Sequence, residues 1–437
     1  MHQHLAARLQ GLLRAGDTLW WGQATAEPLT LTRALVQHRH ALAQGGRLRV
    51  FVGIGHSDTL RPEQADVIDF FGYAASATHR ALAQAGVLDI LPSHYSHIPR
   101  LIGEGVLPAD VVLLQVSPPD GQGRYSLGLV HEYLTAALEK ARVVVAEVHP
   151  AIPWTHGSVH LQAGDFDLLV DAEHPPLDAD SAAPGATERA IARHIAERVP
   201  DAATLQVGIG KIPEAVLSAL HGRRDLGFHS GAIGDGIAAL AESGALTNAR
   251  KGRDAGVGIA GILMGGERLR RWAHRNPGLA LRGTEYTHDP EVLASLHQLV
   301  AINSAIEVDL TGQTNAEVAG GVYVGALGGA VDFLRGAARS RGGLPIVALP
   351  ATAKGATRIV AQLSGPVSTP RCDAGLIVTE HGVADLRGQT LSRRVQRMLD
   401  IAAPEHRAAL ERQAHGALRH RGAVFASCCG CYKKYSQ

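Results

Sequence analysis

The stretch GFHSGAIGDGIAAL, residues 227–240, reads as a strand end, a polar turn and the start of a helix. Open α/β sheets bind their ligands at strand ends of this kind. His229 is a candidate acid or base in this stretch. Gly231 stands where a reacting side chain would project, yet it has no side chain. Any chemistry at this turn must therefore come from groups other than residue 231.

Two glycine-rich segments are candidate ligand-binding turns. LQVGIGKIPEAV (205–216) is a strand that runs into a glycine turn and a helix, and GGVYVGALGGAVDFLRGA (320–337) is denser in glycine than an ordinary loop. Backbone without a Cβ atom can approach a ligand and direct its N–H groups at negative charge. Neither segment has the GxGxxG or Walker pattern. The candidate contacts are Ile209, Gly210 and Lys211 in the first segment and Gly325, Gly328 and Gly329 in the second.

VTEHGVADLRG (378–388) places Glu380 at a strand end beside His381. Both side chains are candidate acid/base groups for a ligand bound at the sheet edge. The alternative is a helix N-terminus that is capped and charged in the usual way.

Continuous apolar runs with helical stretches between them must position these residues. The runs cover 47–55, 110–117, 141–148 and 167–172, then 204–210, 299–310, 344–350 and 374–380. Runs with little alternation indicate strands buried on both faces, as in a mainly parallel sheet covered by helices. The polar, Pro-containing stretch 173–190 separates the two sets. We therefore expect two α/β domains, 1–178 and 179–437.

Composition excludes several partners. The 437 residues carry 42 Lys+Arg against 41 Asp+Glu, so no excess positive charge is available for a nucleic acid. No run is apolar for the roughly 18 residues that a membrane span needs, and the first ten residues lack a secretion-signal pattern. We expect a cytoplasmic protein.

Three cysteines, Cys428, Cys429 and Cys431, crowd the last ten residues. Adjacent cysteines without a histidine or a second pair seldom give tetrahedral zinc geometry, so we expect a frayed tail and no metal site.

Several long segments together resemble the acetyl-CoA hydrolase/transferase family of class I CoA-transferases, most closely the 4-hydroxybutyrate CoA-transferases. They are VGIGKIPEAV, INSAIEVDLTGQ, GALGGAVDFLRGA, VTEHGVADLRG, GQATAEPLTL, LLQVSPPDGQGRYSLG and VVVAEVHPAIPWTHG. The resemblance runs from about Gly16 to about Ala414 and leaves only the cysteine-bearing tail outside.

The resemblance implies two related domains, each a mainly parallel sheet flanked by helices, with the active site in the cleft between them. It also implies a homodimer or larger homo-oligomer, with coenzyme A or acyl-CoA as substrate and no metal or nucleotide redox cofactor. Members of the family exchange CoA between a thioester and a carboxylate. A glutamate attacks the acyl carbon, which gives an acyl-glutamyl anhydride and then a glutamyl-CoA thioester.

The family places that glutamate in a stretch like HSEM or HTEM followed by SDG, and HSGAIGDG matches it with Gly231 at the glutamate position. A glutamyl cycle through residue 231 is then chemically impossible. Glu242 is about three helical turns away, whereas Glu285 and Glu380 are carboxylates that could reach the cleft. We expect the missing side chain to leave space for a water molecule or an acceptor.

The leading hypothesis is an enzyme that acts on acyl-CoA thioesters without a covalent glutamyl intermediate, by positioning and by oxyanion stabilisation. With water as acceptor it would be a hydrolase; with a carboxylate or another small acceptor it would transfer the acyl group or CoA directly. One alternative is a CoA-ester-binding protein or partner subunit without catalytic activity. Another is an ordinary CoA-transferase, if Gly231 is an introduced change.

Overall fold

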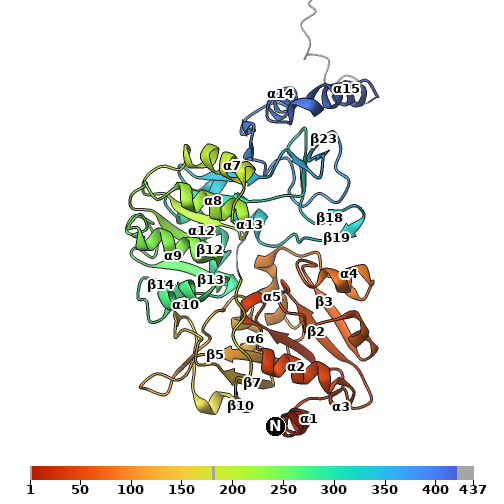
Figure 1. The fold of residues 1–437 in the computed structure, drawn as a ribbon, viewed down its shortest axis with the longest axis vertical. Coiled ribbons are helices and arrows are strands. Elements are labelled where there is room, and N and C mark those ends of the chain that lie inside the picture. The colour runs from red at the N-terminus through yellow and green to blue at the C-terminus, as the bar shows by residue number, and fades with distance from the viewer. Residues whose placement is uncertain (1, 180–182, 421–437) are drawn as a thin grey trace, which may run out of the picture.

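The computed structural model describes residues 2–179 and 183–420, and the three tail cysteines lie outside the described residues. Figure 1 shows two domains stacked along the long axis, with the N-terminal part of the chain below and the C-terminal part above. Each domain contains one large sheet covered by helices. The α/β fold with two mainly parallel sheets is therefore confirmed.

Seven strands of the described chain form the first sheet, in the order β10-β7-β5-β1-β2-β3-β4, and every neighbouring pair is parallel. The strands are β1 (Thr18–Trp21), β2 (Leu48–Val52), β3 (Ile68–Gly72), β4 (Leu88–Ile90), β5 (Val111–Val116), β7 (Val143–Val148) and β10 (Leu168–Asp171). Their helices are α1 (His2–Leu12), α2 (Leu29–Gln37), α3 (Arg39–Leu42), α4 (Arg80–Gln84), α5 (Ile98–Gly103) and α6 (Leu134–Lys140).

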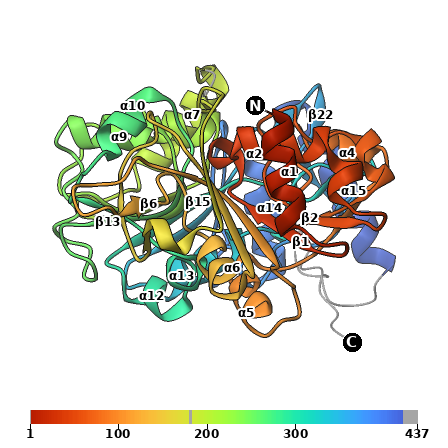
Figure 2. The same cartoon turned by 90° about the horizontal axis from the view of Figure 1, so that it is seen from below.

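Helices cover both faces of this sheet, which is why its strands are apolar without alternation. Leu19 and Trp21 of β1 pack with α1 and α2, whereas Trp20 between them packs with α5 and α6. Successive side chains of a strand point to opposite faces of the sheet. Because helices cover both faces, Trp20 and its two neighbours in the strand, Leu19 and Trp21, are all buried. Figure 2 shows α1 and α2 on one side of the strands and α5 and α6 on the other.

The second sheet has the order β25-β24-β20-β15-β11-β12-β13-β14-β8 in the described chain, and only the β24–β25 pair there is antiparallel. Its strands are β8 (His156–Gly157), β11 (Thr204–Val207), β12 (Gly227–Ile233), β13 (Gly258–Leu263), β14 (Leu279–Leu281), β15 (Leu299–Asn303), β20 (Leu344–Ala348), β24 (Leu376–Thr379) and β25 (Gly382–Asp385). The helices are α7 (Ala186–Ala196), α8 (Lys211–Ala219), α9 (Asp235–Glu242), α10 (Glu267–Ala273), α11 (Thr284–Thr287), α12 (Pro290–Ser295), α13 (Ala330–Arg339), α14 (Leu391–Asp400) and α15 (Pro404–His420).

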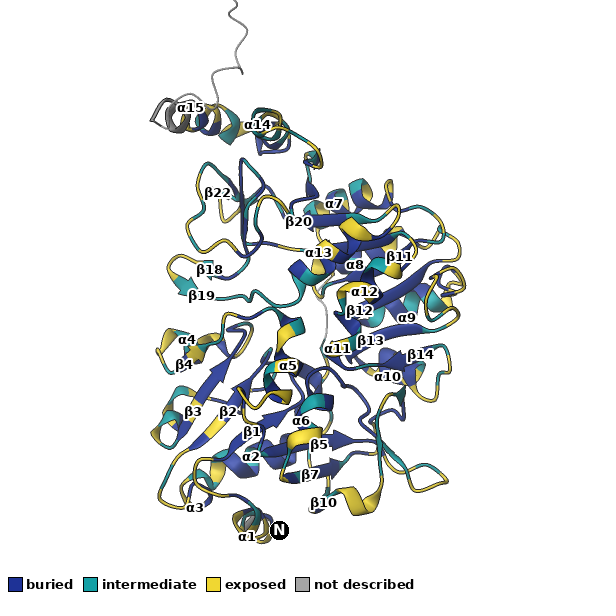
Figure 3. Ribbon diagram, turned by 180° about the vertical axis from the view of Figure 1, so that it is seen from behind, coloured by how far each residue is buried: buried dark blue, intermediate teal, exposed yellow. Residues whose placement is uncertain are grey.

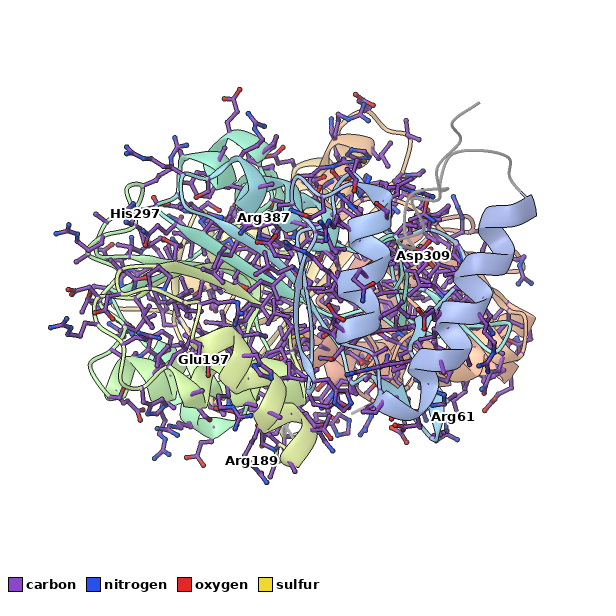
Figure 4. The ribbon with its side chains drawn as sticks, turned by 90° about the horizontal axis from the view of Figure 1, so that it is seen from above. Arg61, Arg189, Glu197, His297, Asp309 and Arg387 are labelled. Atoms are coloured by element: carbon purple, nitrogen blue, oxygen red, sulfur yellow. The ribbon has the colours of Figure 1, made fainter. Side chains whose placement is uncertain are left out.

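Small hairpins and bridges lie outside the two sheets. They comprise β6 (Tyr125–Ser126) with β9 (His160–Leu161), β18 (Val318–Ala319) with β19 (Val322–Tyr323), β21 (Thr352–Ala353) with β22 (Ala356–Thr357), and β17 (Thr314–Asn315) with β16 (Glu307–Asp309) and β23 (Ile359–Val360). Figure 3 shows the strands of both sheets as the most buried elements. Seen from above, Arg189 and Glu197 project outward at α7, while Ile191 and Ile195 of that helix are buried (Figure 4).

Strand β12 corrects the expectation of a turn at residue 231. The strand continues to Ile233, and the helix α9 begins only at Asp235. The reason is pairing with β13, because Ser230 lies opposite Ala260 and Ala232 lies opposite Ile262. Gly231 is therefore inside a strand, where pairing with β13 fixes its backbone.

The seam between the domains is made partly of backbone hydrogen bonds. Val130 forms an antiparallel bridge with Ile262 of β13, and the strand β8 extends the second sheet beside β14. Both segments precede the domain boundary that we predict at residue 178. Across the same seam, the amide of Tyr95 donates to the carbonyl of Gly328 (3.1 Å). Because amide ladders fix register, the two domains are held in one arrangement at this point.

None of the described helices has the length and apolar character of a membrane span.

Candidate active site

Gly231 lies on the seam side of β12 and is partly exposed. A Cβ atom at this residue would lie 3.0 Å from Cε1 and 3.2 Å from Nε2 of His288, and 3.6 Å from Cε2 of Phe333. The space beside Gly231 is therefore bounded by an imidazole and a phenyl ring. This corrects the expectation of open polar room for an acceptor directly at the glycine.

His288 is the side chain that comes closest to this position. It follows the short helix α11, its Nδ1 shares a 2.8 Å hydrogen bond with the hydroxyl of Thr287, and its ring packs on Tyr95 and Phe333 with centroids 5.1 and 4.5 Å away. Burial lowers the pKa of His288 to about 3, so the ring is neutral at physiological pH. Sequence reasoning missed this residue, because a single histidine among 23 carries no visible signal.

A cavity of about 390 Å³ adjoins His288 at the seam, and both domains line it. The first domain contributes Ser96, Pro99, Arg100, Ala136 and Glu139, and the second contributes Thr284, Glu285, His288, Asp289 and Pro290. Glu285, expected as a possible cleft carboxylate, is thus at this cavity, where its carboxylate accepts from the hydroxyl of Thr135 at 3.2–3.3 Å.

A second group that sequence reasoning missed is the carboxyl of Glu132, which is 3% exposed. Its Oε2 accepts a 2.8 Å hydrogen bond from Nε2 of Gln23, and the hydroxyl of Tyr95 also bonds to the carboxyl. Burial raises the pKa of Glu132 to about 8, against the lowering effect of these two hydrogen bonds. The structure therefore holds a carboxyl group beside β12, although residue 231 supplies none.

The first glycine turn lies next to β12. Ile209 and Gly210 follow β11, the parallel neighbour of β12, and Lys211 begins α8. Gly210 has φ of +116°, a conformation that favours glycine, and Ile209 is 40% exposed. The N-terminus of a helix presents N–H groups to negative charge. This turn can therefore stabilise an oxyanion or a phosphate near the end of β12.

The second glycine segment also reaches the seam, but its glycines have different roles. A Cβ atom at Gly325 would lie 2.0 Å from the carbonyl oxygen of Ala316, so Gly325 permits close backbone packing. A Cβ atom at Gly329 would lie 2.4 Å from Nε2 of His288, so Gly329 makes room for that ring. Gly328 has φ of +56° and gives its carbonyl oxygen to the amide of Tyr95. Gly328 and Gly329 thus lie near Gly231, whereas Gly325 is a packing residue.

His229 is on the same strand as Gly231 but is fully buried. Its Nε2 donates to the carbonyl of Thr287 (3.0 Å), and its Nδ1 has no hydrogen-bond partner among the described residues. Burial, followed by the nearby charge of Lys251, lowers its pKa to about 3. This geometry favours a structural role, in which His229 holds α11 against β12.

Glu380 and His381 are not beside Gly231. They follow β24, which is four strand spacings from β12, or roughly 19 Å across the sheet. Oε2 of Glu380 accepts from the amide of Ala351 (2.8 Å). Acid/base action at Gly231 is out of their reach in this arrangement. Contact with a more distant part of a ligand stays a prediction.

Glu242 lies at the end of α9 and forms an ion pair with Arg268 at the surface. It cannot replace a carboxylate at residue 231, as its distance along the helix predicts.

Two family domains match the chain. The acetyl-CoA hydrolase/transferase N-terminal domain matches residues 5–174, and the C-terminal domain of the same family matches residues 265–414. The 4-hydroxybutyrate coenzyme A transferase of Clostridium kluyveri is 35% identical over 394 residues, which are 89% of this chain and 92% of that protein.

Two solved structures are similar over nearly the whole chain. RipA from Yersinia pestis superimposes with a TM-score of 0.89 at 30% identity, covering 95% of this chain and 97% of RipA. The 4-hydroxybutyrate CoA-transferase from Porphyromonas gingivalis gives a TM-score of 0.78 at 30% identity, covering 94% of this chain and 96% of the other.

Proposed function

The chain belongs to the acetyl-CoA hydrolase/transferase family, and from this we propose that it acts on acyl-CoA thioesters without a covalent glutamyl intermediate. The resemblance drawn from the sequence is confirmed at the level of the family, a family of CoA-transferases and acyl-CoA hydrolases. One observation carries the finer proposal. Gly231, at the position assigned to the attacking glutamate, offers no nucleophile, while the elements around it remain ordered and packed.

The residues around Gly231 supply hydrogen-bond donors that could assist a nucleophile that does not belong to the enzyme. Gly210 follows β11, the strand beside β12, and Gly329, at the N-terminus of α13, packs against the same His288 ring that borders Gly231; amides of these two segments are the proposed donors to a developing oxyanion. Such donors are each worth about 3 kcal/mol in other enzymes. An acceptor held in the right orientation adds a larger contribution, up to about 7–11 kcal/mol, because a bimolecular step becomes effectively unimolecular.

Water as acceptor gives a carboxylic acid and free CoA, and a bound carboxylate gives direct exchange. Purified protein incubated with a panel of short-chain acyl-CoAs, each with and without a candidate carboxylate, separates these reactions. Thiol release without a carboxylate indicates hydrolysis, and a new acyl-CoA indicates exchange. Ping-pong kinetics with a trapped enzyme thioester would contradict the proposal.

A second function, binding of CoA esters without turnover, is favoured by one observation. The rings of His288 and Phe333 border Gly231 closely, which leaves little room for an acceptor at that point. Calorimetry distinguishes the two functions, because a pure binder gives a measurable Kd for CoA esters and no product.

Restoring the carboxylate by Gly231→Glu tests whether the rest of the site is competent. The new Cβ atom would be only 3.0 Å from Cε1 of His288. We therefore expect CoA transfer to recover more fully in the double variant Gly231→Glu/His288→Ala than in the single one. A covalent CoA adduct at residue 231, detected by mass spectrometry, is the positive result.

A further inference from the structure

We propose that Glu132 is the general base that activates water for attack on the thioester. This inference rests on the proposed function and names the group that replaces the missing glutamate. Glu132 is supplied by the loop before α6, from the first domain, and meets the second domain at β13.

The carboxyl side chain of Glu132 covers the strand position next to Gly231. In the β12–β13 register Gly231 lies opposite Gly261, so the missing side chains of both glycines would point to the same face. A Cβ atom at Gly261 would lie 2.7 Å from the carbonyl oxygen of Gly231 and 3.1 Å from Cγ of Glu132. Gly261 therefore makes the room that Glu132 enters, one strand away from the lost nucleophile position.

A hydrogen-bond network fixes the orientation of the carboxyl group. Oε1 of Gln23 accepts from the amide of Ile54 (2.8 Å) and from the hydroxyl of Tyr73 (2.7 Å). These two bonds fix the orientation of the Gln23 side-chain amide, because its oxygen can only accept and its nitrogen can only donate. Nε2 therefore faces Glu132 (2.8 Å) and the hydroxyl of Tyr95 (3.0 Å). All four hydrogen bonds of Gln23 are used, so its side chain is an anchored donor to Glu132.

The backbone at Glu132 is held in a strained conformation by both domains. Its φ is +40°, in the left-handed region that few residues other than glycine adopt. Its carbonyl oxygen accepts from the amide of Thr284 (3.2 Å), and the preceding amide, of His131, donates to Gly261 (2.9 Å). Strain of this kind persists only where the surroundings over-determine it, and it concentrates at functional sites.

Tyr95 connects Glu132 to the groups around Gly231. Its hydroxyl bonds to the carboxyl of Glu132, its ring packs on His288, and its amide binds Gly328 in the glycine segment. In Figure 3, α11, which precedes His288, lies between β12 and α5 of the first domain. The carboxyl, the imidazole and the glycine segment thus form one continuous cluster across the seam.

The surroundings of Glu132 suit a base. The titratable groups that interact with its carboxyl are the hydroxyls of Tyr73, Tyr95 and Tyr133, and burial raises the pKa of all three. They stay neutral, so within this cluster of described residues Glu132 is the group that changes charge near pH 8, where burial sets its pKa. A general base is most effective when its pKa is close to the working pH.

The step balances without another reactant. The water oxygen forms a bond to the thioester carbonyl carbon while its proton moves to an oxygen of the Glu132 carboxylate. Collapse of the tetrahedral intermediate breaks the C–S bond, and the proton held by Glu132 goes to the leaving sulfur. The products are the carboxylic acid and CoA, and Glu132 returns to its ionised state.

Glu132→Gln in the full chain, assayed with acetyl-CoA and butyryl-CoA by thiol release, tests the assignment. We expect kcat to fall about 100-fold or more with little change in KM. The wild-type rate should rise with pH toward a plateau above about 8, because only the ionised carboxyl accepts a proton. The variant should lose this rise. Glu242→Gln, at the surface end of α9, is the control carboxyl variant and should keep both rate and profile.

A second variant keeps the test decisive if the amide substitution unfolds the protein. Glu132→Asp retains the carboxyl group but withdraws it by one methylene, so the pH dependence should remain while kcat falls. Thermal unfolding of each variant identifies a loss of structure. An unchanged kcat in a folded Glu132→Asp protein overturns the assignment.

Three other outcomes are also decisive. If the wild type hydrolyses acyl-CoA and Glu132→Gln does so within about threefold, Glu132 is not the base and the proposed function stands. A covalent adduct trapped on Glu132, or thiol release that requires an added carboxylate, would show that Glu132 is not a general base acting on water. If the wild type neither binds nor turns over any acyl-CoA, the proposed function and this inference both fail.

Discussion

Glu132 and Glu147 are both buried carboxyls of the first domain, yet their surroundings differ. Oε2 of Glu147 accepts from the backbone amides of Thr30 (2.8 Å) and Leu31 (3.3 Å), which belong to the first turn of α2. Among the described residues, the carboxyl of Glu132 accepts only from side chains, those of Gln23 and Tyr95. Burial raises the pKa of each, to about 7 for Glu147 and about 8 for Glu132.

This difference separates a structural carboxyl from one that is free for chemistry. The first amides of a helix have no partner within the helix, so Glu147 satisfies the amide of Thr30, whereas the amide of Leu31 also donates to the carbonyl of Pro28 (3.0 Å). Within the part of the chain that the structure describes, the Glu132 carboxyl accepts from no backbone amide; it accepts from one N–H of the Gln23 side chain, whose other N–H bonds to Tyr95. A raised pKa alone therefore does not identify a functional group; the identity of its partners does.

Removing the two carboxyls in turn should give the largest effect. We expect Glu147→Ala to lower the free energy of unfolding by about 4 kcal/mol and Glu132→Ala by about 2 kcal/mol, since only the former leaves a backbone amide, that of Thr30, unsatisfied. Urea denaturation of both variants measures the difference. Equal losses would remove the distinction drawn between the two sites.

Gly329→Ala tests the packing on the seam side. The added methyl would lie 2.4 Å from Nε2 and 2.6 Å from Cδ2 of His288, so the buried ring must move. We expect a loss of about 2 kcal/mol in stability. Loss of most of that cost in a background that also carries His288→Ala would identify the imidazole as the cause, and an undiminished cost would exclude it.

The pH dependence of stability sharpens the comparison between Glu132 and Glu147. Both pKa values are raised above 4.5, so the folded chain keeps a proton that the unfolded chain releases, and this stabilisation is lost as pH rises through each folded pKa. Between pH 7 and 8 mainly Glu132 still contributes, with a fall of at most about 1.4 kcal/mol per pH unit. The unfolding free energy of the wild type minus that of Glu132→Gln should fall through this window, because contributions shared by both proteins, such as those of Lys251 and the buried histidines, cancel.

Gly231→Ala should have the smallest effect. Its methyl would lie 3.0 Å from Cε1 of His288, a contact that a shift of a few tenths of an ångström relieves. We expect less than about 1 kcal/mol of destabilisation and no loss of thiol release. A large drop in activity would show that the acyl group itself occupies the space beside Gly231.

The sequence predicted the sheets better than the site. The runs 110–117 and 141–148 became β5 (Val111–Val116) and β7 (Val143–Val148), because burial on both faces produces continuous apolar stretches. The glycine segments were also recognisable, and the structure places Gly210, Gly328 and Gly329 near the end of β12. Their predicted contacts with CoA remain to be tested.

The groups around Gly231 could not be predicted in the same way. Glu132 approaches Gly261, and His288 approaches both Gly231 and Gly329, over separations of 40 or more residues in the chain. Glu380 and His381 follow the end of a strand, as the residues after β12 do. Their strand, β24, lies four strand positions from β12. The position of a residue just after a strand predicted that it lies at the edge of a sheet. The order of the strands, which the sequence did not show, decided which of these residues lie close together.

Residue types and their local order determined the family, the two α/β domains and the absence of a side chain at residue 231, because these follow from patterns within short segments. Only the tertiary structure decided that an imidazole borders this glycine and that a carboxyl from the other domain lies one strand away. The physical reason is that burial and hydrogen bonding across a seam depend on segments far apart in sequence, and they set both where Glu132 lies and what its pKa is.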